Sequence, residues 1–166
     1  HGEVALAGDV DDVVGAYIQG SGEPPSKADG APIRCERLER ASSEDIPSGG
    51  WLAFTLSGVI ADAARVHETL GVGIVVRPMS SGSALFSINS DAVHATLPAS
   101  GAFVADVELQ MNVAPGVYTV QAVVRDRHNS RIVHRGPWAS VRVSGTVVST
   151  GIVQMNPRIS FREPHQ

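Results

Sequence analysis

Two runs of alternating apolar and polar residues constrain the fold of this chain more than any other feature. The first run, residues 103–111, places these apolar residues on one parity: Phe103, Ala105, Val107, Leu109 and Met111. The second follows the turn Ala114-Pro115-Gly116 and places these on one parity: Tyr118, Val120, Ala122 and Val124. Because successive side chains of a strand point to opposite faces, both runs predict half-buried strands. We interpret them as a β-hairpin at the centre of an all-β domain.

Further short strands are predicted by apolar alternation between turn residues. They cover residues 33–40, 51–60, 71–78, 84–89, 138–144 and 147–155, with loops at 42–50 and 125–137. The heavily charged run 33–40 suits a sheet edge, whereas the apolar run 71–78 suits a central strand. Tyr118, just after Gly116, is typical of the tyrosine corner, in which the hydroxyl bonds to the strand's own turn. The sequence thus predicts an immunoglobulin-like antiparallel β-sandwich of about eight strands, all-β apart from a short N-terminal helix.

The N-terminal segment differs from the rest. Asp9 is a suitable helix N-cap, and Val10, Val13, Val14, Tyr17 and Ile18 follow at helical spacing. The next residues, 20–30, are rich in Gly, Pro and Ser, which indicates a linker. We therefore divide the chain into a helical segment (1–19), a linker (20–30) and a β-sandwich (31–162). Because the chain begins with His1 and not Met, we expect it to be part of a longer protein.

The composition excludes several classes of function. A net charge of -4 lacks the basic surplus that nucleic-acid binding requires, so we expect no nucleic-acid partner. Cys35 is the only cysteine, which rules out an intrachain disulfide and favours a cytosolic setting. No apolar run reaches the roughly 18 residues of a membrane span.

Motifs for catalysis are absent from the sequence. It contains no phosphate-binding loop, dinucleotide fingerprint, nucleophile elbow or zinc-protease motif. The histidines are scattered, so we expect no metal site, no cofactor and no enzymatic activity. Cys35 fits a packing residue better than a nucleophile, and Asp106 and Glu108 fit the solvated face of a sheet.

Two features remain as candidate binding elements. Residues 125–142 collect five arginines and two histidines: Arg125, Arg127, Arg131, Arg135, Arg142, His128 and His134. Such a cluster could hold a phosphate or carboxylate, although a solvated hairpin tip has the same composition. Trp51 and Trp138 fall off the core parity, so either could stack on a sugar ring, but a tryptophan at a strand start is also often covered by a loop.

Several segments together resemble the C-terminal domain of the ATP-binding subunit of O-antigen polysaccharide ABC transporters, the Wzt family. They are 71–78 with 86–89, then 114–120, then 138–145 and 150–153, in that order. The resemblance covers roughly residues 30 to 160. Residues 2–17 are similar to the last strand and helix of an ABC nucleotide-binding domain, whose ATPase core would lie upstream.

The resemblance implies a cytoplasmic domain, peripheral to the inner membrane, that binds the non-reducing end of a lipid-linked polysaccharide for export. It also implies a permease partner and a homodimer formed by exchange of the C-terminal strand, here residues 147–155. That strand has apolar residues on both parities, as expected for a strand covered on both sides. From strand parity we expect Thr119, Gln121 and Arg142 to contact the glycan and Trp138 to be its stacking platform.

One other class of function fits the same sequence. The domain could be a protein-interaction module that docks on the permease or on a glycan-modifying enzyme through the arginine-rich loop. An extracellular adhesion domain is a third possibility, disfavoured by the missing disulfide and by the ATPase-like start.

Overall fold

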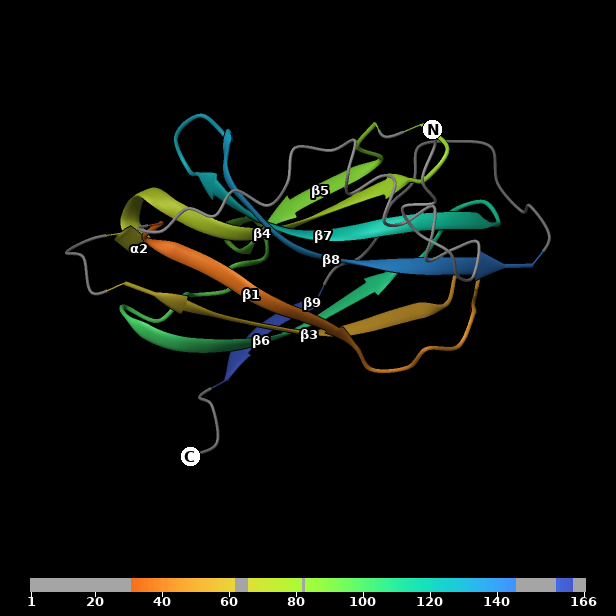
Figure 1. Ribbon diagram of the computed structural model, residues 1–166, viewed down its shortest axis with the longest axis horizontal. Helices are drawn as coiled ribbons and strands as arrows, with labels where there is room; N and C mark the ends of the chain where they lie inside the picture. Colours follow the sequence, from red (N-terminus) through yellow and green to blue (C-terminus); the bar gives the residue numbers. More distant parts are fainter. Residues whose placement is uncertain (1–30, 62–65, 82, 146–157, 163–166) are drawn as a thin grey trace, which may run out of the picture.

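The fold consists of two β-sheets that face each other (Figure 1), as seen in a computed structural model that describes residues 31–61, 66–81, 83–145 and 158–162. The strands are β1 (Ile33–Arg40), β2 (Ile46–Pro47), β3 (Trp51–Ile60), β4 (Leu70–Pro78), β5 (Phe86–Asn89), β6 (Gly101–Gln110), β7 (Gly116–Asp126), β8 (Ile132–Ser144) and β9 (Arg158–Arg162). One helical turn, α2 (Val66–Thr69), precedes β4, and a 3-10 turn, Ser90–Val93, follows β5. Within the described residues, no helix is long and apolar enough to cross a bilayer.

One sheet has four strands in the order β1-β3-β6-β9, and the other has five in the order β2-β8-β7-β4-β5. All neighbouring strands are antiparallel except the short pair β2 and β8. β1 lies at a sheet edge and β4 in a sheet interior, which confirms both sequence expectations. The β-sandwich prediction is thus confirmed at the level of two packed sheets.

The core lies between the sheets and is filled by the apolar parity of each strand. In β3 and β6 every second residue is buried, with Phe54 and Phe103 among the largest. In β7 the predicted residues Tyr118, Val120 and Ala122 are buried as well. Burying side chains of this size removes most of their apolar surface from water, at roughly 25 cal/mol per Å². The strand alternation read from the sequence therefore defines the core.

The predicted hairpin between residues 103–111 and 114–124 is wrong. β6 pairs with β3 and β9 in the four-stranded sheet, whereas β7 pairs with β4 and β8 in the five-stranded sheet. Met111 and Val113, in the connection, are almost fully buried. Apolar residues in a connection fit a chain that crosses the end of the core better than a solvent-exposed turn, so the chain passes here from one sheet to the other.

Three other boundaries differ from the predicted ones. The loop predicted at 125–137 is shorter, because β7 continues to Asp126 and β8 begins at Ile132. The loop at 42–50 contains the two-residue strand β2, and the strand predicted at 84–89 begins at Phe86. The predicted N-terminal helix, the linker and the strand at 147–155 lie outside the described residues.

Tyr118 anchors the start of β7, as predicted. Its hydroxyl donates a hydrogen bond to the carbonyl oxygen of Ala114 at 2.6 Å. The ring is buried, with 6% of the residue exposed, and this burial raises the pKa of the phenol. The bond closes the turn in front of β7 and so helps to place the first residues of that strand.

We predict that Tyr118→Phe lowers the free energy of unfolding by about 1 kcal/mol, because the Ala114 carbonyl loses its buried donor while the ring still fills the core. Urea denaturation followed by tryptophan fluorescence measures this difference. Thr119→Val, which changes a neighbouring hydroxyl on the other face of β7, is the control. Equal stability of Tyr118→Phe and the unmodified chain would show that the bond contributes nothing.

Candidate functional site

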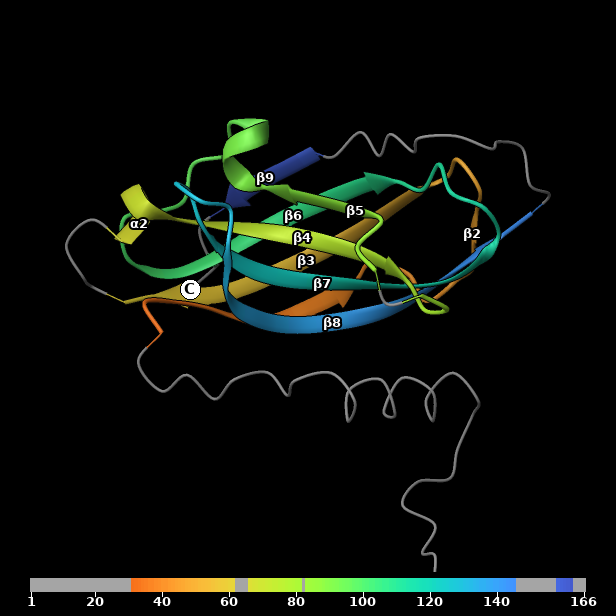
Figure 2. The same cartoon turned by 90° about the horizontal axis from the view of Figure 1, so that it is seen from above.

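Strands β7 and β8 lie side by side in the five-stranded sheet (Figure 2), and their register brings together on its outer face the four residues predicted to contact a glycan. Gln121 on β7 lies opposite Trp138 on β8, and Thr119 lies opposite Ser140. Arg142 pairs with Val117, one step further along the same face. Gln121, Thr119 and Trp138 are half-buried and Arg142 is exposed. The four residues therefore form one continuous surface, about 13 Å long from the four-residue spacing of Trp138 and Arg142.

Gln121 is held in a fixed orientation at the centre of this surface. Its Oε1 accepts a hydrogen bond from Arg77 Nη1 at 3.1 Å, and its Nε2 donates to the Gly136 carbonyl oxygen at 3.3 Å. A primary amide has two donor hydrogens and two acceptor lone pairs, so one of each remains for a ligand. The planar amide beside an indole ring can thus bond to adjacent hydroxyl groups.

A β-bulge in β8 places Arg135 on the same face as Trp138. Trp138 lies opposite Gln121. Arg135 precedes Trp138 on β8 by three residues, but it lies opposite Val123, which follows Gln121 on β7 by only two. In a regular strand, residues three apart point to opposite faces, so the extra residue reverses the parity. Gly136 makes this possible because a Cβ there would be 2.7 Å from Cys35 Cβ on β1. Sequence reasoning treated Arg135 as part of a loop.

Three arginines from neighbouring strands lie on this face: Arg77 on β4, Arg125 on β7 and Arg135 on β8. Arg125 donates from Nη2 to Ser87 Oγ at 2.6 Å and from Nη1 to the Ser130 carbonyl oxygen at 2.5 Å. Burial and the charge of Arg135 lower the pKa of Arg125, and burial with both other guanidinium groups lowers the pKa of Arg77. The three positive charges are therefore close enough to repel one another.

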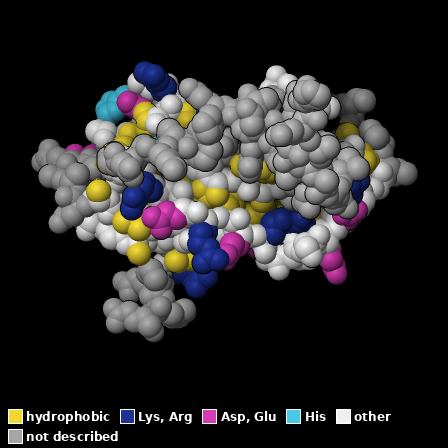
Figure 3. All heavy atoms as spheres, in the orientation of Figure 1, with side chains coloured by type: hydrophobic (Ala, Val, Ile, Leu, Met, Phe, Trp, Pro, Cys, Tyr) yellow, Lys and Arg dark blue, Asp and Glu magenta, His cyan; other side chains and the backbone are white. Residues whose placement is uncertain are grey.

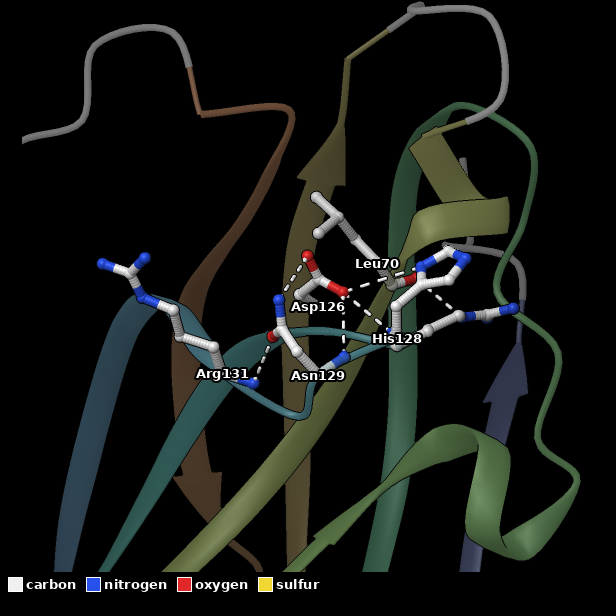
Figure 4. Close-up of polar contacts among 6 residues, drawn as sticks. Leu70, Asp126, His128, Asn129 and Arg131 are labelled. Atoms are coloured by element: carbon white, nitrogen blue, oxygen red, sulfur yellow. Dashed lines mark hydrogen bonds and ion pairs between the residues drawn. The ribbon is translucent and has the colours of Figure 1, made fainter.

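The tip of the β7–β8 hairpin is a separately ordered turn (Figure 4). Asp126 Oδ1 accepts hydrogen bonds from the backbone N–H groups of His128, at 2.8 Å, and Asn129, at 3.4 Å. Arg127 turns away to Asp91, at 2.8 Å, and donates from Nε to the Leu70 carbonyl oxygen. The arginine side chains of residues 125–142 therefore do not all point to one surface.

Several other arginines of the domain pair with acidic neighbours. On β1, Arg34 pairs with Glu36 at 3.5 Å, and Arg37 pairs with Glu39. Figure 3 shows basic and acidic side chains next to each other where β1 runs in Figure 1. Further pairs on β6 and β9 are Arg158–Glu108 and Arg162–Asp106. Asp106 and Glu108 therefore lie on the solvated sheet face as expected, with basic partners.

The second outward tryptophan, Trp51, lies on the four-stranded sheet. It is 44% exposed, and the guanidinium carbon of Arg158 lies 4.6 Å from its ring centroid. Two shallow hollows of about 280 and 420 Å³ flank β3 in the described part of the domain. Trp51 lines the smaller one and Arg158 the larger one, whereas none of the four predicted contact residues lines either. This surface is a second place where a ring could stack.

Cys35 is a packing residue, as expected from the sequence. It is 5% exposed and lies between the sheets, and burial raises the pKa of its thiol to about 12. A thiol that stays protonated at neutral pH is a poor nucleophile and a poor metal ligand. Within the described ranges, no group of three or more His, Cys, Asp or Glu residues is placed to hold a metal ion.

The fold places this chain among two-sheet β-sandwich domains. It is similar to the crystal structure of the C-terminal domain of wzt, with a TM-score of 0.53 and 11% identity over 75% of this chain and 85% of that one. The sensor domain of the anti-sigma factor RsgI4 from Pseudobacteroides cellulosolvens scores only 0.37 at 9% identity, which is too low to compare folds. No family model matches the sequence, and a comparison with curated proteins finds no match. At this identity the likeness to wzt establishes a common fold.

We predict that the free energy of unfolding falls as the pH rises above about 9, partly because of Cys35. The thiol has a pKa of about 12 in the folded chain against 9.0 in the unfolded one. Between these values the unfolded chain loses a proton that the folded chain keeps, which favours unfolding. Tyr118, whose pKa is also raised, adds a decrease of the same sign.

Urea denaturation at about pH 8 and about pH 10 measures this loss, and Cys35→Ala should show a smaller loss than the unmodified chain. The same decrease in both proteins would contradict the assignment to Cys35.

Proposed function

We propose that the outer face of the five-stranded sheet recognises O-antigen polysaccharide, without chemical change, for export by an ABC transporter. The observation that carries the proposal is the pairing of half-buried Trp138 with Gln121, whose amide is already held by Arg77 and Gly136. The fold shared with the C-terminal domain of wzt supports it.

The chemistry of these residues suits a sugar. The indole of Trp138 offers an apolar surface to the C–H face of a pyranose ring. The planar amide of Gln121 and the hydroxyl group of Thr119 can form hydrogen bonds with the hydroxyl groups of the sugar. Arg142, two pairs further along the sheet, extends the polar contacts to the next sugar. Because Gln121 is already held by two hydrogen bonds, little of its side-chain entropy is lost on binding.

The remaining parts of the proposal concern the setting of the domain. Residues 1–19 end an ABC nucleotide-binding domain, residues 20–30 link it to the glycan-binding sandwich 31–162, and the parent protein works in the cytoplasm with a transmembrane permease. The ligand is the non-reducing end of a lipid-linked glycan. Two copies form a homodimer, with residues 147–155 as the exchanged strand, so that two weak sites act together.

We predict that Trp138→Ala weakens binding to the O-polysaccharide of the source organism at least about tenfold, or about 1.4 kcal/mol, because the stacking surface is lost. Calorimetric titration of the purified domain measures the affinity, with an unrelated serotype as the ligand control. Trp51→Ala, which removes the same side chain from the other sheet, is the matched variant and should bind normally.

Loss of binding in Trp51→Ala but not in Trp138→Ala would move the site to the four-stranded sheet. Equal binding of both polysaccharides, or of neither, would refute selective glycan recognition. Normal glycan binding by Arg127→Ala and Arg131→Ala, with loss of permease binding, would support the interaction-module alternative for the hairpin tip.

We also predict a homodimer in solution. Sedimentation equilibrium over a range of concentrations should give twice the chain mass at the higher ones, and replacement of residues 147–155 by a Gly-Ser segment of equal length, which keeps β9, should give the monomer mass. A monomer at every concentration of the full chain would contradict the proposal.

A further inference from the structure

We propose that Arg77, Arg125 and Arg135 form a receptor for the anionic group, carboxylate or phosphate, of an acidic polysaccharide whose ring stacks on Trp138. The inference rests on the proposed function and names the class of its ligand. It begins from an unusual feature of this face: three half-buried arginines lie on adjacent strands, and one of them, Arg77, is bonded to Gln121.

The three arginines come from three adjacent strands and share the face of the predicted glycan contacts. Arg77 pairs in register with Thr119, and its guanidinium reaches Gln121 Oε1. Arg135 lies opposite Val123, next to the pair formed by Gln121 and Trp138. A sugar on the indole ring therefore has Arg135 beside it on β8 and Arg77 bonded to the neighbouring Gln121, while Arg125 lies further along the same face.

Two of these arginines are held in place before any ligand binds. Arg77 is oriented by Gln121, and Arg125 by Ser87 Oγ and the Ser130 carbonyl oxygen. Arg125 Nε is buried and has no hydrogen-bond partner, which is costly for a charged donor. Arg135 makes no hydrogen bond or ion pair with any residue that the structure describes, so its whole planar fork can bind a ligand.

The electrostatics of the cluster favour an anion. None of the three arginines pairs with a carboxylate within the described residues, although the chain as a whole carries a net charge of -4. By contrast, Arg127, Arg158 and Arg162 all have an acidic partner. Mutual repulsion and partial burial disfavour the charged cluster, and a bound anion would remove this penalty.

The geometry of guanidinium groups specifies the kind of anion. Each presents parallel N–H donors that match the two oxygens of a carboxylate or of a phosphate. An oxyanion accepts several charged hydrogen bonds at once, so neighbouring guanidinium groups on one face suit it better than a sugar hydroxyl group. A uronic acid and a phosphorylated sugar both supply this chemistry, so the ligand is an acidic glycan of one of these two kinds.

The test compares sugars that differ only in charge. Oligogalacturonate and its methyl ester form one pair, and phosphomannan oligosaccharide before and after phosphatase treatment forms the other. Calorimetry should show that the chain, residues 1–166, binds the charged member of at least one pair about tenfold more tightly, and the pair that responds identifies carboxylate or phosphate. Added salt should weaken that preference.

The matched variants are Arg135→Gln and Arg37→Gln, which each remove one positive charge. Arg135→Gln should reduce the preference for the charged sugar about tenfold, since a hydrogen bond to a charged group is lost, while Arg37→Gln on β1 should leave it unchanged. Unchanged circular dichroism and melting temperature would show that both variants fold.

The outcomes separate this inference from the proposed function. Binding that depends on Trp138 but shows no charge preference in either pair overturns the acidic ligand and keeps glycan recognition. A charge preference that is equal in the two arginine variants also overturns it. Arg135-dependent binding of inorganic phosphate without any binding of sugars supports the anion receptor and overturns glycan recognition.

Discussion

The register of β7 between β4 and β8 is the constraint on which the rest of the structure depends. This strand is hydrogen-bonded on both sides, its inner side chains fill the core and its outer side chains form the candidate site. A shift of one residue would turn Thr119 and Gln121 into the core and Tyr118 and Val120 into solvent. The burial of Tyr118 and its bond to Ala114 oppose such a shift, so the same forces stabilise the fold and place the site.

The bulge in β8 adapts this scaffold to binding. It lets Arg135 and Trp138, three residues apart, share the outer face, and it needs Gly136 because β1 passes close by at Cys35. Bulges commonly redirect side chains next to functional sites. Here the result is an indole ring, a fixed amide and three guanidinium groups on one surface, which links the proposed glycan contacts to the proposed anion receptor.

Much of the candidate site could be predicted from the sequence, because strand parity alone separates Thr119 and Gln121 from their buried neighbours. Trp138 and Arg142 followed from the same alternation in residues 138–144, the second half of β8. Arg77 and Arg135 could not be found this way. Arg77 ended a run interpreted as a buried central strand, and Arg135 lay in a presumed loop, so their meeting depends on strand order and on the bulge.

Alternation along the chain was enough to predict most of the strands and their buried sides, because a period of two is a local property, but it missed β2, β9 and the first half of β8. Only the tertiary structure decided which strands pair. The runs 103–111 and 114–124 lie next to each other in the chain but in different sheets, since the buried Met111 and Val113 carry the connection across the end of the core. Pairing depends on packing between distant segments, and alternation within one strand contains no information about its partner.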